Sequence, residues 1–379
     1  MNTELGALAG YTIAVTADRR ADEQIELLER RGARVVHGPT IRTLPLDDDA
    51  VLDRVTRSLI DRPPDHVVLT TAIGVRSWHA WAESNDLGRP LHTALSQATV
   101  ITRGPKARGA AVTLDLEVAW SAPGSRIAEV VHHLSSVAEP GSRVALQLDG
   151  GTNADIADDL TGRGFDVVPV SAYRWTLPVD LGAADRVVTA ICDRTVDAVT
   201  VTASPALRNL FELAARSGRL DAMTANLGPG AVDVICVGPA CVEAAADLGI
   251  AATISPTQPR LGAMVQSYAA SVAPRSSSLE LAGVSVVVQG RAAFIDGQVE
   301  VKLSDRERDV LAVLARRPGR VVSKATLVRE VWDNHEGDEH VVEVTVGRLR
   351  RRLGPAGAGI ETVVRRGYRL DAEPAAGLH

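Results

Sequence analysis

Residues 340–370 read HVVEVTVGRLRRRLGPAGAGIETVVRRGYRL, and this basic stretch decides how the C-terminal part of the chain is interpreted. At about 100° per residue, helical spacing over 340–353 gathers four apolar residues on one stripe, which predicts a helix that packs into a core. The four are Val342, Val346, Leu349 and Leu353. Seven basic and two acidic residues give the stretch a net charge of +5, although the formal charge of the whole chain is −6. Positive charge is therefore concentrated here.

The other faces of this predicted helix carry guanidinium groups and little bulk, as expected of a surface that enters a DNA groove. Gly347 costs a helix about 1 kcal/mol relative to alanine, so its presence indicates close approach of another molecule. We expect the helix to contact DNA through Val344, Gly347, Arg348, Arg350, Arg351 and Arg352.

Two short strands are predicted after the helix, at 360–364 and 367–370, and they form a hairpin. Arg365 and Arg366 lie at its tip, where they would reach phosphates or the minor groove, and Tyr368 lies in its second strand. Tyr368 is also expected at the DNA surface. Arginine runs alone are more often the solvated face of a basic helix than a DNA site. The residues upstream are needed to choose between these interpretations.

Residues 301–368 resemble the winged-helix effector domain of OmpR/PhoB-type response regulators. The matching residues are Leu303-Ser304, Glu307, Leu311, Leu314, Pro318-Gly319-Arg320-Val321-Val322-Ser323, Leu327, Val331-Trp332, 342–349, Thr362-Val363 and Gly367-Tyr368-Arg369. The resemblance implies that the chain regulates transcription, with double-stranded DNA as its partner and a dimer on DNA as one arrangement. The family usually has glycine where Arg365 stands, so we expect an altered turn in the wing.

Length and composition set limits on the rest of the chain. A chain of 379 residues, 45% of them hydrophobic, is expected to form two or three domains. We see no signal peptide and no apolar run long enough to span a bilayer, so we expect a cytoplasmic protein without a membrane partner. The three cysteines, Cys192, Cys236 and Cys241, have neither metal-binding nor redox spacing. We therefore expect no metal site.

Residues 8–272 alternate between β-branched runs and helical spacing, which predicts parallel sheets covered by helices on both faces. Strands are expected at 12–16, 35–36, 66–70, 98–102, 143–148, 165–170, 197–202, 232–237 and 251–254. Helices are expected between them, including 20–31, 73–84, 124–136, 153–162, 204–216, 239–248 and 260–272. The predicted fold class is α/β with doubly wound parallel sheets, followed by an α+β winged helix-turn-helix domain.

An internal repeat indicates that this α/β part contains two copies of one lobe. The turn at Thr70 recurs 132 positions later at Thr202, and Gly104-Pro105 recurs 134 positions later as Gly238-Pro239. Any doubly wound protein repeats strand–turn–helix units, but two pairs at nearly one spacing favour duplication.

Residues 8–272 resemble uroporphyrinogen-III synthase, the enzyme that closes and inverts the linear tetrapyrrole precursor. The similar residues are Leu28, Gly32-Ala33, Pro39, Thr70-Thr71, Gly104-Pro105, Asp149-Gly150-Gly151, Leu160, Gly164, Val170, Tyr173-Arg174, Thr202 and Gly238-Pro239. The resemblance implies a two-lobed domain over 8–272. Lobe one is then 8–40 with 176–272, lobe two is 43–172, and the chain crosses between them near 41–43 and 172–175.

The segment between the two resemblances is expected to be a linker at 273–279, because its residues are small, polar and include proline. The winged-helix domain then covers 280–372. Its first part, 280–302, contains three short β runs with turns at Gln289-Gly290 and Asp296-Gly297. Ser304 and Glu307 predict a capping box at the helix that follows.

The strand-to-helix turns of the two lobes form the candidate ligand site, since helix N-termini present backbone N–H groups to anions. By the resemblance, the ligand is a tetrapyrrole rich in carboxylates. The expected ligand-binding residues are Thr70, Thr71, Ala72, Arg103, Gly104, Lys106, Gly150, Gly151, Asn153, Tyr173, Thr202, Ala203, Ser204, Gly238, Pro239 and Ala240. Any single turn is explained by an ordinary helix start, whereas five turns facing one cleft favour a ligand.

Tyr173 stands where the resemblance places a cleft tyrosine, which would donate a hydrogen bond to the leaving oxygen if the chain is an enzyme. The alternative is that Tyr173 only closes the strand ladder between the lobes. The family's Gly-x-x-Thr turns read Gly104-x-x-Ala107 and Gly238-x-x-Cys241 here. Each change removes a hydroxyl expected to face the substrate, so we expect weak or absent synthase activity.

The motifs and the two resemblances are compatible with three functions. The leading hypothesis is a transcription regulator whose lobes sense a tetrapyrrole effector or bind another regulator. This fusion resembles actinobacterial regulators of nitrate and nitrite assimilation, and nitrite reductase uses sirohaem made from uroporphyrinogen III. The second hypothesis is an active uroporphyrinogen-III synthase, a lyase, with a DNA-binding domain. The third is a scaffold with empty lobes. The lobes carry the acidic excess, so we also expect that they can cover the arginine face and hide it from DNA.

Overall fold

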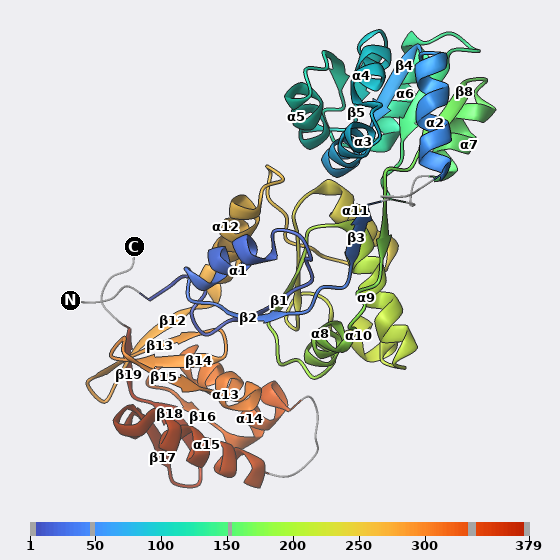
Figure 1. The fold of residues 1–379 in the computed structure, drawn as a ribbon. Coiled ribbons are helices and arrows are strands. Elements are labelled where there is room, and N and C mark those ends of the chain that lie inside the picture. The colour runs from blue at the N-terminus through green and yellow to red at the C-terminus, as the bar shows by residue number, and fades with distance from the viewer. Residues whose placement is uncertain (1–4, 46–49, 151–153, 333–338, 375–379) are drawn as a thin grey trace.

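The computed structural model describes residues 5–45, 50–150, 154–332 and 339–374. Three bodies follow one another along an elongated molecule, with the C-terminal domain at one end and the body built from residues 50–170 at the other (Figure 1). Within the described ranges, no helix combines the length and the apolar character needed to cross a bilayer.

The middle body, lobe one, is a four-stranded parallel sheet in the order β11-β10-β1-β2. Its strands are β1 (Thr12–Val15), β2 (Arg34–His37), β10 (Ala198–Val201) and β11 (Asp233–Cys236). Its helices are α1 (Ala21–Glu29), α8 (Gly182–Cys192), α9 (Ser204–Arg216), α10 (Leu220–Asn226), α11 (Pro239–Asp247) and α12 (Leu261–Val272). The central strands are buried on both faces, as their continuous β-branched runs predict.

Lobe two is a five-stranded parallel sheet in the order β6-β5-β4-β7-β8. Its strands are β4 (His66–Leu69), β5 (Thr99–Thr102), β6 (Val118–Ser121), β7 (Arg143–Gln147) and β8 (Asp166–Val170). Its helices are α2 (Ala50–Asp61), α3 (Ala72–Ser84), α4 (Gly88–Ser96), α5 (Pro105–Thr113), α6 (Ile127–Val137) and α7 (Ala154–Gly162). Two apolar clusters, one on each face of the sheet, form its core.

The chain passes between the lobes through two antiparallel strands, β3 (Arg42–Pro45) and β9 (Tyr173–Thr176). These strands lie at the crossings expected from the sequence. The segment 251–254, expected as a strand, is not one: only Ile254 bridges to Ile235, because Ala251 and Ala252 are exposed and their methyl groups bury little apolar surface against the sheet.

The C-terminal domain begins with a small antiparallel sheet and ends with a helical unit and a hairpin. Its strands are β12 (Ser277–Leu281), β13 (Val284–Gln289), β14 (Ala292–Ile295), β15 (Val299–Lys302), β16 (Val321–Val322), β17 (Ile360–Val363), β18 (Gly367–Leu370) and β19 (Ala372–Pro374). Its helices are α13 (Asp305–Ala315), α14 (Lys324–Val331), α15 (His340–Leu353) and the 3-10 turn η2 (Gly354–Gly359).

The first sheet of this domain differs from the three strands expected over 280–302. An additional tight turn at Ala282 and Gly283, both with positive φ (51° and 78°), separates β12 from β13. Strand β12 begins at Ser277 and η1 covers Ala273–Arg275, so the segment expected to be a linker is largely ordered. The sequence did not reveal this strand because its serines resemble linker composition, although Leu279 and Leu281 alternate into the core.

The C-terminal domain is attached to lobe one by a contact that we call the domain joint, formed by Gln289 and Arg291 with Gly10 and Asp197. The Gln289 side-chain amide donates to the carbonyls of Gly6 (2.9 Å) and Ala9 (3.1 Å), and Arg291 N donates to Gly10 O (3.0 Å). Arg291 Nε also donates to Asp197 (2.8 Å), whose other oxygen accepts from Thr12 N (2.7 Å).

Backbone crowding at the domain joint explains why residue 10 is a glycine. A Cβ on Gly10 would lie 2.3 Å from Gln289 O, and the φ of Gly10 is +79°. Because Thr12 and Asp197 lie at the amino ends of β1 and β10, the C-terminal domain sits at the edge of the sheet opposite its carboxyl ends. Helix α15 lies on the far side of that domain (Figure 1). The expectation that the lobes cover the arginine face is therefore wrong for this conformation.

Candidate nucleic-acid interface and inter-lobe site

Helix α15 packs through the predicted apolar stripe, since Val342, Val346, Leu349 and Leu353 are all buried in the core of the C-terminal domain. The arginine-bearing face is open: Arg348 and Arg351 are exposed, Val344 is 37% exposed, and a Cβ on Gly347 would meet no atom within 4 Å. Across the part of the chain that the structure describes, neither arginine side chain has an ion-pair or hydrogen-bond partner. This face is free to receive a ligand.

The acidic residue of α15 is neutralised within the domain. Glu343 pairs with Lys324 of α14 and lies 3.4 Å from His340 Nδ1. The Lys324 ammonium, followed by His340, holds the pKa of the Glu343 carboxyl below its ordinary value. The first turn of the helix therefore carries less free negative charge than its sequence implies.

Three of the residues expected at the DNA surface make contacts within the domain. Arg352 is exposed, and it pairs with the buried Glu307 (3.1 Å) and donates to Lys302 O. Arg350 donates to Ile360 O (2.7 Å) and lies over the ring of Tyr368 at 5.7 Å. Tyr368 itself is only 5% exposed. A helical projection could not separate these side chains from Arg348 and Arg351, because their partners come from other elements.

The tip of the β17–β18 wing presents Val364, Arg365 and Arg366, all exposed. Arg366 N donates to Val363 O (2.9 Å), which closes the turn. Arg365 has a φ of 60°, the left-handed region that favours glycine. Arg365, in place of the usual glycine, therefore adds a charged side chain at the tip. Its backbone keeps the left-handed conformation that glycine adopts at lower cost.

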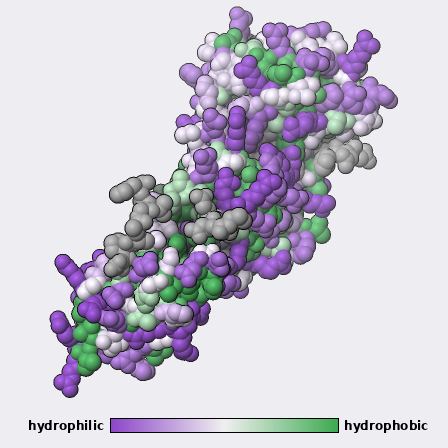
Figure 2. Space-filling view, turned by 90° about the vertical axis from the view of Figure 1, so that its left-hand side faces the viewer, coloured by the Kyte–Doolittle hydropathy of each residue, from purple (hydrophilic) through white to green (hydrophobic). Residues whose placement is uncertain are grey.

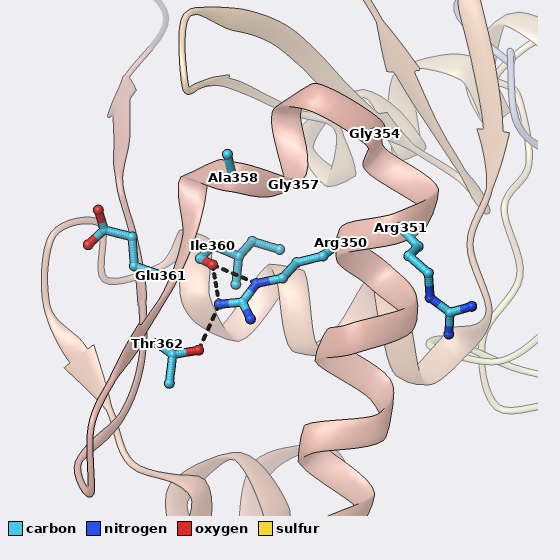
Figure 3. A pocket seen from close by; sticks show the side chains of 8 residues that line it. All are labelled: Arg350, Arg351, Gly354, Gly357, Ala358, Ile360, Glu361 and Thr362. Carbon is cyan, nitrogen blue, oxygen red and sulfur yellow. Dashed lines mark hydrogen bonds between the residues drawn. The ribbon is translucent and has the colours of Figure 1, made fainter.

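An open hollow of about 840 Å³ lies between the C-terminal end of α15, η2 and β17. Figure 3 shows its lining and the opposite directions of two neighbouring arginines: Arg350 reaches toward β17, whereas Arg351 points away from it. The residues around the hollow are Arg350, Arg351, Gly354, Gly357, Ala358, Ile360, Glu361 and Thr362.

Between the lobes, the turn after β4 is held by side chains of lobe two. Thr70 donates its hydroxyl to Gln147 O (2.8 Å), and Thr71 caps α3 by accepting from Gly74 N (3.1 Å). Tyr173 lies with its hydroxyl 3.1 Å from Thr71 Oγ1 and is 1% exposed. Burial raises the pKa of the Tyr173 hydroxyl, and the hydrogen bond with Thr71 partly opposes this shift. The phenol is therefore neutral.

The two repeated turns have the same backbone geometry. Gly104 and Gly238 both precede a proline at the first position of a helix, with φ near 175° and ψ near 180° in each. A Cβ would lie 2.5 Å from Ser125 Oγ at the first and 2.9 Å from Pro259 Cβ at the second. Neighbouring loops therefore leave little room for a Cβ at either position.

Ala107 and Cys241, which stand where hydroxyls were expected, are both buried, at 2% and 3% exposure. Cys241 contacts the Ser204 hydroxyl, and burial raises the pKa of its thiol to about 11. Ser204 in turn donates to Ala240 O (2.8 Å), which ties α9 to α11. In this conformation neither position presents a side chain to the space between the lobes.

Basic side chains from both lobes converge where the sheets' carboxyl ends face each other. Arg126 of lobe two pairs with Glu243 of lobe one (2.7 Å). Lys106 is exposed, and partial desolvation, together with the nearby Arg20 of lobe one and Arg103, lowers its pKa. Desolvation followed by Arg76 of lobe two lowers the pKa of Arg19 in the same way.

Four of these basic residues, Arg19, Arg20, Arg76 and Arg126, were missed by sequence reasoning. Their signal was their place between a strand and the following helix, or near the start of that helix, at the carboxyl edge of a sheet. Arg103, by contrast, is paired with the buried Asp149 (3.2 Å). Gly151 and Asn153 lie outside the described residues.

The remaining expected ligand residues line the same turns: Ala72, Thr202 and Ala203 are half-buried, Pro239 and Ala240 are exposed, and Gly150 packs against Tyr173 and Trp175. Within the described ranges, no group of three or more His, Cys, Asp or Glu side chains is placed to hold a metal ion. The arrangement can bind an anion through helix N-termini and cationic side chains.

Comparison with known proteins divides the chain in the same two parts. Residues 22–266 match the family described as "Uroporphyrinogen-III synthase HemD", and residues 297–370 match the family "Transcriptional regulatory protein, C terminal". A solved structure of mutant uroporphyrinogen III synthase from the extremely thermophilic bacterium Thermus thermophilus is 25% identical, with a TM-score of 0.56, over 70% of this chain and 99% of that chain. The similarity confirms the expected α/β fold of the lobes.

Two curated relatives match different parts of the chain. The uncharacterized protein YjjA of Bacillus subtilis is 26% identical over 258 residues, which cover 68% of this chain and 94% of YjjA. Transcriptional regulatory protein CutR of Streptomyces coelicolor is 43% identical over 98 residues, which cover 26% of this chain and 44% of CutR. The chain therefore spans less than half of CutR.

Proposed function

Because the chain belongs to the uroporphyrinogen-III synthase family over residues 22–266 and carries a winged-helix domain of the transcriptional-regulator type, we propose that it is a transcription regulator. Helix α15 and the wing bind double-stranded DNA, and the two lobes act as a sensor or a partner-binding module. One observation carries the proposal: Arg348 and Arg351 of α15 are exposed on a face that no other described element covers.

Selection of binding sites from random duplexes, followed by titration at several salt concentrations, tests the DNA function. Arg348→Ala with Arg351→Ala should lower affinity for the selected site by at least tenfold, because each guanidinium lost from the groove costs about 1–3 kcal/mol. The matched control is Arg54→Ala with Arg89→Ala, which removes the same charge from exposed positions of lobe two. Equal affinity of the two double variants would refute the proposal.

The sensor function rests on the cationic residues between the lobes. Arg19 and Arg20 from lobe one lie near Arg76, Arg103 and Lys106 from lobe two, and like charges repel unless an anion binds among them. A tetrapyrrole with several carboxylates, contacted by both lobes, would neutralise these groups. Calorimetric titration with uroporphyrinogen III should give saturable binding that Arg76→Ala weakens and Arg54→Ala does not. Absence of binding to the wild-type protein would favour the scaffold hypothesis.

A second candidate function is uroporphyrinogen-III synthase activity, favoured by the buried neutral Tyr173 and its hydrogen bond with Thr71. The assay supplies hydroxymethylbilane and separates product isomers I and III. We expect weak or absent turnover. Formation of isomer III at roughly 1 per second or faster, lost in Tyr173→Phe, would establish the enzyme instead.

The physiological role that we propose is control of nitrate and nitrite assimilation, in which sirohaem links a tetrapyrrole signal to nitrite reduction. Binding as a dimer, or together with another regulator, would fit this role. A genome-wide map of occupied sites, made with and without nitrate, would identify the controlled genes. Sites confined to unrelated genes would contradict the proposal.

A further inference from the structure

Arg350 belongs to α15, yet its guanidinium is directed at the wing rather than at solvent (Figure 3). Its Nε donates to Ile360 O (2.7 Å), and its Nη2 donates to the same carbonyl and to Thr362 Oγ1 (2.9 Å). One side chain therefore joins the recognition helix to two residues of β17.

The same side chain also contacts the second strand of the wing. Its guanidinium carbon lies 5.7 Å from the ring centroid of Tyr368, a residue of β18 that is almost fully buried. Tyr368 pairs with Thr362 across the hairpin and with Val322 of β16. The guanidinium therefore contacts β18, the central strand of the three-stranded sheet that carries the wing.

The backbone of Arg350 is fixed as tightly as its side chain. A Cβ on Gly357 would lie 2.3 Å from Arg350 O, so η2 packs directly on the last turns of α15. Asp371 N then donates to Gly359 O (2.8 Å), which ties the end of η2 to the end of β18. The helix, η2 and the hairpin form one packed unit around this residue.

We propose that Arg350 is a positioning residue that sets the angle between α15 and the wing, so that the helix and the wing tip engage one duplex together. The inference rests on the proposed DNA function. It separates Arg350 from its neighbour Arg351, which is exposed and points away from β17. Arg351 contacts DNA directly, whereas Arg350 acts through Arg365 and Arg366 at the wing tip.

Arg350→Lys is the decisive substitution, because it keeps the charge and loses the planar fork that binds Ile360, Thr362 and the Tyr368 ring. In the full-length protein, we expect about tenfold weaker binding to the selected site and a flatter slope of log affinity against log salt, because the displaced wing tip loses phosphate contacts although Arg350→Lys removes no charge. Arg366→Ala, which removes one such contact directly, should flatten the slope by about 0.9. Wild-type affinity and slope in Arg350→Lys would overturn the inference.

A double-mutant cycle distinguishes positioning from loss of stability. In an Arg365→Ala, Arg366→Ala background, the wing no longer contributes, so Arg350→Lys should cost less than about twofold. In an Arg348→Ala background it should still cost about tenfold. Equal costs in the two backgrounds would overturn the inference.

Thr362→Val provides a milder version of the same change, because it removes one acceptor at an exposed position and leaves Arg350 in place. We expect a smaller loss of affinity that also disappears in the wing-tip background. A loss that persists there would count against the inference. Failure of the wild-type protein to bind any selected duplex would instead refute the DNA function itself.

Discussion

At the scale of single residues, the conformation of Arg365 leads to a prediction with opposite effects on stability and binding. A left-handed φ costs a non-glycine residue about 1–2 kcal/mol, and a glycine at the same position avoids this cost. Glycine has more conformational freedom in the unfolded chain, and this entropy offsets part of the stabilisation. Arg365→Gly should therefore raise the free energy of unfolding by about 0.5–1 kcal/mol while weakening DNA binding. Urea titration and anisotropy measure the two effects. Arg366→Gly, at a position without a positive φ, is the control: it should also weaken DNA binding, but it should lower the free energy of unfolding instead of raising it.

A second residue-scale prediction concerns the buried thiols. Burial raises the pKa of Cys241 to about 11 and that of Cys236 to about 12, from an ordinary value of 9.0. Because the folded state keeps both thiols protonated, they support stability fully below pH 9, and this contribution is lost as pH rises toward 11. The loss for one thiol is on the order of 2–3 kcal/mol.

Chemical denaturation between pH 7 and pH 10.5 measures this effect, with Cys241→Ala expected to flatten the decline above pH 9. A disulfide reagent at pH 8 should react with the half-buried Cys192 before the two buried cysteines. Rapid labelling of Cys241 in the folded protein would contradict the prediction.

The residue scale also shows where prediction from sequence ended. The apolar stripe of α15 and the exposure of Arg348 and Arg351 followed from helical spacing alone. The inward roles of Arg350 and Arg352 did not, because Ile360 O and Glu307 come from elements whose packing angle no local pattern specifies. Arg19 and Arg76 were missed for the same reason: their proximity depends on how the two lobes meet.

At the scale of elements, the start of α13 gives a prediction about its cap. Ser304 Oγ accepts from Glu307 N (3.3 Å), and Glu307 accepts in return from Ser304 N (2.8 Å), so the predicted capping box is confirmed. Glu307 also pairs with Arg352, which links the cap to the recognition helix. Ser304→Ala should lower the free energy of unfolding by about 1–2 kcal/mol.

Thermal unfolding of the full protein, followed by circular dichroism, checks this cost. Ser278→Ala, an exposed serine of β12 in the same domain, serves as the control and should change stability by less than about 0.5 kcal/mol. Equal stabilities of the two variants would contradict the assigned cap.

Elements with strong local signals were predicted well, and those whose signals are non-local were not. The central strands of both lobes and helix α15 lie where the sequence places them, and β3 and β9 lie at the crossings that the family resemblance implied. Strand β12 was hidden by its serines, and 251–254 imitated a strand because the β-branched residues Thr253 and Ile254 follow two alanines. Pairing partners, rather than propensity, decide such short segments.

At the scale of the whole molecule, the domain joint determines how the lobes can influence DNA binding. Helix α15 faces away from the lobes, so a ligand cannot act by uncovering it in this conformation. The joint holds the amino ends of β1 and β10, whose carboxyl ends lead to Arg19 and Thr202 near the inter-lobe site. Each strand spans about 3.3 Å per residue, so the two sites lie within one sheet's length of each other.

Hydrophilic side chains cover much of the face seen in Figure 2, including the region of the two lobes. At the joint, Ala9, Ala292 and Phe294 form a small apolar contact. Arg34 of lobe one and Glu300 add an ion pair at its edge. The orientation of the winged-helix domain therefore depends on few residues.

The last prediction distinguishes two roles of the lobes: they either only hold the winged-helix domain in place, or they also cover its DNA-binding face. A fragment of residues 276–379 retains β12 and the apolar core of the C-terminal domain, which lies within 279–370. If the lobes only hold that domain, the fragment and the full protein should bind a single site within about twofold of each other, whereas a cover would make the fragment at least about fivefold tighter.

A tetrapyrrole that closes the lobes should then change the affinity of the full protein alone, by roughly 5–150-fold for a coupling of about 1–3 kcal/mol. Arg291→Ala breaks the link to Asp197 and should abolish this response while leaving ligand binding and basal DNA affinity unchanged. Arg34→Ala, at the exposed edge of the joint, is the matched control and should retain the response. A ligand effect that survives in Arg291→Ala would mean that coupling does not pass through the Arg291–Asp197 pair, because the Gln289 side chain and the backbone N–H of residue 291 still bind lobe one in that variant.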